Sequence, residues 1–136
     1  MQVDLDDVRS YSFLSIGCGL LADIDIQSER LRFMGESRYT LWAYYRVIDL
    51  KRYRNRLSYI EYSEDEQASC PRKVIEGHFM FIHASFVSHI GTDLYFAPTS
   101  CPGDGIIHLA YLEGRDATRA NAFRFLLGLE NGMPLL

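Results

Sequence analysis

The chain has 136 residues, of which 48% are hydrophobic and 24% charged, with a net charge of −4. This length suits one domain, and the apolar fraction excludes a disordered chain. The acidic balance and the lack of a long Lys/Arg stripe argue against nucleic-acid binding. No run of 18 apolar residues and no signal peptide is present, so we expect a cytoplasmic protein with at most peripheral membrane contact.

Along the first half of the chain we expect a strand over residues 11–22, whose glycines permit a bulge or a close backbone approach. Ser28 can cap a short helix to about Met34, and Gly35 supplies its left-handed stop. A second helix should cover residues 37–51, because apolar side chains recur there at helical spacing and form one face: Leu41, Tyr44, Tyr45 and Ile48.

In the second half we expect strands over residues 55–62, 76–85 and 106–112, and a weaker one over 93–97. The polar, Pro-ended segment 63–72 should be a loop and the least ordered part of the chain. The last helix should run over 117–130 and end before Gly132. Strands outnumber helices, and the helices interrupt them irregularly. The pattern therefore predicts an α+β fold built on an antiparallel sheet or sandwich.

Two carboxylates, Asp23 and Asp25, follow the first apolar stretch two positions apart. On an extended strand both side chains would point to the same face, where they could meet a cation beside an apolar cavity. The alternative is a pair of solvated acids at the entry of a helix, which the helix dipole favours. Composition alone favours this alternative.

Two arginines, Arg32 and Arg38, bracket Gly35. Their guanidinium groups suit the bidentate binding of phosphate oxygens. The alternative is an exposed helix face on which Glu29 and Glu36 are their partners, and the spacing alone favours it.

The remaining candidates for chemistry are weak. The turn at 101–105 contains Asp104 between glycines, but a strand follows it where a phosphate loop needs a helix, so we expect an ordinary turn. The odd number of cysteines and the scattered histidines predict reduced thiols and no metal site. One apolar set could line an acyl-chain slot or simply form the core: Ile90, Leu94, Leu112, Phe125, Leu126 and Leu129.

Residues 19–41 strongly resemble the sphingosine kinases. The shared pattern is an apolar-Ala-Asp-x-Asp run (to Asp25), then Ser28-Glu29, then Gly35-Glu36 and an Arg-aromatic-Thr-Leu segment. The likeness continues through residues 89–98, 105–111 and 118–132, and it covers nearly the whole chain after residue 10 apart from 63–75. Ceramide and diacylglycerol kinases differ in the Asp-x-Asp run. Residues 17–18, Trp42 and Ala110 depart from the pattern usual in the family.

The resemblance implies that residues 1–136 are a single, incomplete domain: the antiparallel, β-sandwich-like C-terminal lipid-binding half of a lipid kinase. It implies transfer of a phosphoryl group from ATP, with Mg²⁺, to sphingosine, giving sphingosine 1-phosphate at a membrane surface. The family's N-terminal catalytic domain, with its nucleotide loop and catalytic Asp, has no counterpart here. We therefore expect no catalytic residue in this chain, no replacement by Asp104, and no activity of the isolated chain.

By the same resemblance, Asp25 holds the head group of a sphingoid base, and Arg32 and Arg38 contact the nucleotide phosphates. The resemblance also assigns the lining of the lipid pocket to seven apolar residues: Leu20, Ile90, Leu94, Leu112, Phe125, Leu126 and Leu129. Two alternatives stay open at this point. One is a non-catalytic lipid-binding or regulatory module, and the other is half of a ceramide or diacylglycerol kinase, which Asp25 disfavours because those lipids carry no free amine.

Overall fold

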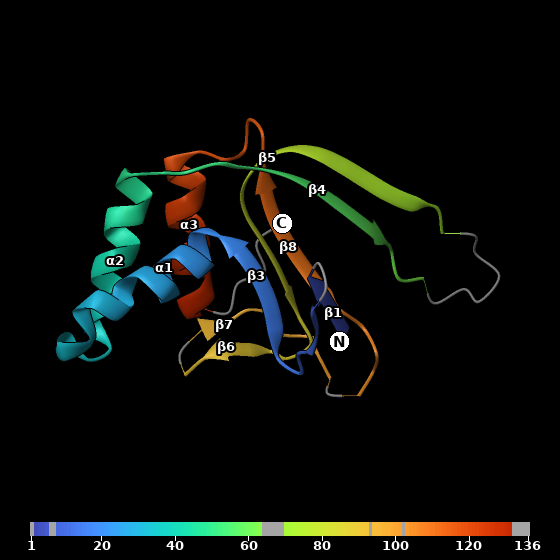
Figure 1. Ribbon diagram of the computed structural model, residues 1–136, viewed down its shortest axis with the longest axis horizontal. Helices are drawn as coiled ribbons and strands as arrows, with labels where there is room; N and C mark the ends of the chain where they lie inside the picture. Colours follow the sequence, from blue (N-terminus) through green and yellow to red (C-terminus); the bar gives the residue numbers. More distant parts are fainter. Residues whose placement is uncertain (1, 6–7, 64–69, 93, 102, 132–136) are drawn as a thin grey trace.

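The structure, a computed structural model, describes residues 2–5, 8–63, 70–92, 94–101 and 103–131. Its elements confirm the α+β class with antiparallel strands (Figure 1). They are β1 (Gln2–Leu5), β2 (Val8–Tyr11), β3 (Ser15–Gly19), α1 (Leu20–Ser28), η1 (Glu29–Met34), α2 (Ser37–Ile48), β4 (Tyr53–Ile60), β5 (Arg72–Ser85), β6 (His89–Gly91), β7 (Leu94–Tyr95), β8 (His108–Glu113) and α3 (Arg119–Asn131). Most of the expected loop, 64–69, lies outside the described residues, as do Asp93 and Gly132.

The long strand β5 organises the main sheet. Phe79 pairs with Tyr53 of β4 on one side and with Glu113 of β8 on the other, so β4 and β8 lie at opposite edges of β5. Strand β3 pairs with the last part of β5, from Phe81 to Ser85, and therefore follows β4 along the same edge. In Figure 1, β4 and the first half of β5 extend away from the helices as a two-stranded arm. Two smaller antiparallel sheets, β1–β2 and β6–β7, complete the described strands.

The hydrophobic core lies between the sheet and the helices. Leu20 and Ile24 of α1 meet Phe81 of β5, and Phe125 of α3 stacks on Phe81 with 4.1 Å between ring centroids. Burial of these side chains removes apolar surface from water, which is the main force that holds the helices against the sheet. In the described part of the chain, helices cover this face of the sheet.

The first strand ends earlier than the sequence predicted, because Leu20 begins a helix. Gly19 makes this abrupt change possible through φ 83° and ψ −138°, a conformation that other residues avoid. The expected Ser28-capped helix is a 3₁₀ helix, η1, and Ser28 Oγ donates to Asp25 O within the preceding helix. Gly35 ends η1 with φ 63°, as expected of a glycine stop.

The apolar face predicted for the second helix does not form the buried side of α2. Leu41, Tyr44, Tyr45 and Ile48 are 48–70% exposed, whereas Arg38 and Arg46 are buried. The arginines can occupy the inner face because nearby carboxylates neutralise them, a tertiary effect that helical spacing does not reveal. The helix also ends at Ile48, three residues before the predicted end.

The predicted second-half elements are present with shifted ends. Strand β5 starts at Arg72, four residues early, and β8 covers His108–Glu113. Of the described residues 94–97 in the predicted strand 93–97, Leu94–Tyr95 form β7. The last helix, α3, buries Phe125 and Leu129 and leaves Phe123 and Leu127 about 40% exposed.

Gly19 should be irreplaceable for a steric reason as well as a conformational one. A Cβ at Gly19 would lie 2.2 Å from Met80 O, whereas a Cβ at Gly35 meets nothing within 4 Å. Both glycines have similar backbone angles. We expect Gly35→Ala to cost about 1–2 kcal/mol of unfolding free energy, and Gly19→Ala to cost a further ~1–3 kcal/mol. Denaturant melts of the two variants measure the difference, and equal losses would contradict the close packing of β3 on β5.

Candidate functional site

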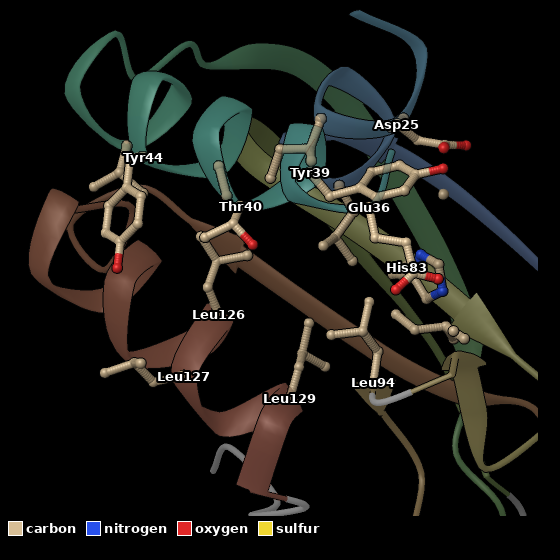
Figure 2. Close-up of a pocket in the computed structure, with 18 of the residues that line it drawn as sticks. Asp25, Glu36, Tyr39, Thr40, Tyr44, His83, Leu94, Leu126, Leu127 and Leu129 are labelled. Atoms are coloured by element: carbon tan, nitrogen blue, oxygen red, sulfur yellow. The ribbon is translucent and has the colours of Figure 1, made fainter. Parts of the chain in front are cut away.

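A cavity of about 970 Å³ lies among α1, α2, α3 and the strands β5 to β7. Figure 2 shows Asp25, Glu36, Tyr39 and His83 on one side of the cavity. The other side is mainly apolar and carries Leu94, Leu126, Leu127 and Leu129, together with the polar side chains of Thr40 and Tyr44. The cavity is thus amphipathic, with carboxylates at one end and leucines at the other.

Asp25 lines the cavity, and Asp23 does not. The expectation that both share one face is wrong, because both lie on helix α1, where side chains two positions apart point in very different directions. Asp25 is exposed and forms no ion pair among the described residues. It is therefore free to pair with a cation in the cavity.

Asp23 joins α1 to α2 and to the main sheet. Its Oδ2 accepts from Arg46 Nη2 at 2.5 Å and from the Tyr53 hydroxyl at 2.7 Å. The Arg46 side chain is only 1% exposed, and Asp49 Oδ2 accepts from its Nη1 at 3.1 Å. Burial, followed by the bond to Asp23, raises the pKa of Tyr53. Asp23 is thus a structural carboxylate that neutralises a buried cation.

The two arginines expected at a phosphate converge on one carboxylate, that of Glu29. Arg38 Nη1 donates to Glu29 Oε1 at 2.7 Å, and Arg32 Nε lies 3.5 Å from Glu29 Oε2. The bond from Arg38 lowers the pKa of Glu29, and the bond to Glu29 raises the pKa of Arg38. Arg38 is buried and also donates to the Tyr39 hydroxyl, whereas the Arg32 side chain is 81% exposed. Neither arginine is among the described residues that line the cavity.

Four of the seven residues expected in a lipid pocket line the cavity: Ile90, Leu94, Leu126 and Leu129. Leu20 and Phe125 are 2% and 3% exposed and lie in the core, against which Leu112 packs. The core and the cavity wall are continuous, since Leu129 belongs to both. Residue type alone could not separate them.

Glu36 and His83 are polar cavity residues that the sequence did not predict. Glu36, considered only as a partner of the arginines, lines the cavity instead. His83 lies in β5, and burial lowers its pKa from 6.5 to about 4, which keeps the ring neutral. His83 lies two positions after Phe81 on β5, so the alternation of side chains along a strand could have placed both on one face. The sequence does not show which face is inward, because the register of β5 shifts between Phe79 and Phe81.

The other predicted features carry no site. In the turn at 101–105, the Asp104 carboxylate accepts the backbone N–H groups of Cys101 and Ile106, which lowers its pKa and confirms an ordinary turn. Pro102 lies outside the described residues. The three cysteines are free thiols. Within the described ranges, no group of three or more His, Cys, Asp or Glu side chains could hold a metal ion, and no helix is long and apolar enough to cross a membrane.

Comparison with known proteins points to one family. The chain is 31% identical to sphingosine kinase 1 of Caenorhabditis elegans and 29% identical to human sphingosine kinase 1, over 92% of this chain in each case. A shorter match, 41% identical over 63 residues, covers 46% of this chain and 10% of human sphingosine kinase 2. The chain spans 39% of the length of the first two relatives. No family model matches it.

Substitution of Asp23 should reduce the unfolding free energy much more than substitution of Asp25. Asp23→Asn removes the charge that faces buried Arg46, so we expect a loss of about 1.5–3 kcal/mol of unfolding free energy. Asp25→Asn changes an exposed, unpaired carboxylate and should stay within about 0.5 kcal/mol of the parent chain. Chemical denaturation of both variants checks this. A larger loss for Asp25→Asn than for Asp23→Asn would show that the two roles have been assigned the wrong way round.

His83 should make stability depend on pH. Its pKa in the fold is about 4, below its ordinary 6.5, so between these values the unfolded chain binds the proton more readily. The contribution of His83 is therefore complete above pH 6.5 and is lost as pH falls toward 4. At 1.36 kcal/mol per pKa unit, it amounts to about 3 kcal/mol at most. As pH falls from 6.5 to 4, the unfolding free energy of the parent chain should decrease relative to that of the His83→Leu chain, and parallel curves would contradict the prediction.

Proposed function

Because this chain belongs to the sphingosine kinase family, we propose that its cavity binds the long-chain amino alcohol that such a kinase phosphorylates. The observation that carries this proposal is the pairing of free carboxylates, Asp25 and Glu36, with a leucine wall in one cavity. A sphingoid base has the same division, with a cationic amine at one end and a hydrocarbon chain at the other. The volume of about 970 Å³ lies within the range of roughly 300–1,000 Å³ typical of ligand pockets.

In this proposal Asp25 binds the ammonium group, and the hydrocarbon chain lies along Leu94, Leu126 and Leu129. A charge-assisted bond to Asp25 fixes the head group and so orients the neighbouring hydroxyl for reaction. Glu36 adds a second negative charge at the same end, which increases the preference for a cation. An N-acylated lipid such as ceramide has no ammonium group and would leave both carboxylates without a partner.

We further propose that Arg32 and Arg38 bind the phosphates of ATP in the whole protein. The chemistry of the donors fits, because Glu29 already draws both guanidinium groups to one anion. ATP supplies the phosphoryl group, and Mg²⁺ offsets its charge. Arg32 is exposed and can reach a phosphate directly, whereas Arg38 has to exchange Glu29 for it. In this proposal the base that accepts the hydroxyl proton lies in the part of the relatives that this chain does not cover.

Contact with a membrane surface is also part of the proposal, since the substrate is a membrane lipid. Helix α2 presents Leu41, Tyr45 and Ile48 to solvent, and Tyr44 on the same face lines the cavity. An apolar face that leads into a lipid cavity suits the transfer of a lipid from a bilayer without crossing it.

The test of this function is the binding of sphingosine and of ATP to a complete kinase that contains this chain as its lipid-binding part, and to its single variants. Asp25→Asn removes one charge and should weaken sphingosine binding about ten- to a hundredfold, which corresponds to a charge-assisted bond of roughly 1.5–3 kcal/mol. Binding of ATP should change little. Arg32→Ala should show the reverse pattern, with the loss confined to ATP. Equilibrium titrations with sphingosine and with ATP measure both effects.

Asp104→Asn is the matched control, because it removes an exposed carboxylate outside the cavity and should leave both titrations unchanged. Equal affinity for sphingosine and ceramide, or equal loss of sphingosine and ATP binding in Asp25→Asn, would contradict the proposed role of Asp25. ATP binding that Arg32→Ala leaves unchanged would contradict the proposed role of Arg32.

A further inference from the structure

His83 is an unusual side chain in the wall of the cavity, because it is polar, buried and, in the described part of the chain, without a hydrogen-bond partner. It lies on β5 between Phe81 and Ser85, both of which are buried, and its own ring is only 7% exposed. Neither ring nitrogen has a hydrogen-bond partner among the described residues. A buried polar group without a hydrogen bond destabilises the fold by about 1–3 kcal/mol. The position of the His83 ring therefore calls for an explanation.

The described neighbours of His83 fix the position of the ring but form no hydrogen bond with its nitrogens. Gly17 on the neighbouring strand β3 leaves room for the ring, because a Cβ there would lie 2.5 Å from His83 Nδ1. On another side Phe96 packs edge-on, with 4.7 Å between ring centroids. The ring is therefore fixed by a glycine and an aromatic side chain, neither of which can accept or donate a side-chain hydrogen bond to it.

The ring also faces the ligand space. His83 lines the same cavity as Asp25 and Leu94, and in the view of Figure 2 it lies between them. A ligand with its ammonium group at Asp25 and its chain along Leu94 would pass the His83 ring between these two residues. A neutral imidazole offers one N–H donor and one nitrogen acceptor, which together match a hydroxyl group.

We propose that His83 is a specificity-determining residue that selects long-chain bases carrying a further hydroxyl group on the hydrocarbon chain, next to the amino-alcohol head. This inference rests on the proposed function, since it assumes that a long-chain base occupies the cavity. The hydroxyl group satisfies a ring nitrogen that has no partner in the protein. A base without that hydroxyl covers the ring with hydrocarbon and leaves both nitrogens unpaired, which is the arrangement that a polar site rejects.

The test uses two ligands that differ by this one group, sphinganine and 4-hydroxysphinganine, titrated into the full chain. We expect the parent chain to bind 4-hydroxysphinganine about tenfold more tightly. His83→Leu should abolish the preference by weakening the binding of 4-hydroxysphinganine and leaving or improving that of sphinganine. His83→Gln keeps a donor and an acceptor and should retain part of the preference. Gly17→Ala, which displaces the ring without replacing it, should reduce the preference and covers the case in which His83→Leu fails to fold.

Leu126→Ala is the matched control, because a truncated apolar wall should weaken both ligands by the same factor. A parent chain that binds both bases equally, or a His83→Leu variant that keeps the full preference, would overturn the role of His83 while leaving the proposed function intact. Binding of neither base would overturn the proposed function and this inference together.

Discussion

The contact between Asp23 and Arg46 determines how the two helices of the site face the rest of the molecule. Arg46 is buried in α2, and Asp23 reaches it from α1 while also accepting from Tyr53 of β4. A buried guanidinium without its carboxylate is strongly unfavourable, so the rotation of α1 and α2 about their axes is tied to this pair. With Asp23 turned toward Arg46, Asp25 is left on the cavity side of α1. With Arg46 turned inward, the apolar face of α2 is left outward.

In that arrangement the carboxylates near the cavity have different roles. Asp23 neutralises a cation of the protein, and Glu29 gathers Arg32 and Arg38. Asp25 and Glu36 line the cavity without an ion pair among the described residues. Two carboxylates without protein counterions beside a leucine wall favour a ligand that brings its own positive charge and a long apolar chain. The same cavity contains His83, a neutral histidine whose ring nitrogens have no hydrogen-bond partner among the described residues.

The family relationship and the geometry support each other at different levels. Relatives named sphingosine kinases match most of this chain, although it spans only 39% of the length of the longest matches. The geometry adds what such a likeness does not contain: which acid is structural, which acids line the cavity, and which apolar residues belong to the core. Helix α2 contributes to the first of these through Arg46, which pairs with Asp23.

The sequence by itself determined the fold class, most of the helices and strands, and the glycine that ends η1, because these follow from local preferences and short-range periodicity. It also contained the Asp-x-Asp run on which the family resemblance rests. It could not separate Asp23 from Asp25, since that difference arises only when Gly19 turns the chain into a helix and Arg46 arrives from a distant segment. Nor could it show that Glu36 and His83 face the cavity, or that Leu20 and Phe125 belong to the core. Those assignments depend on contacts between residues far apart in the chain, which only the tertiary structure decides.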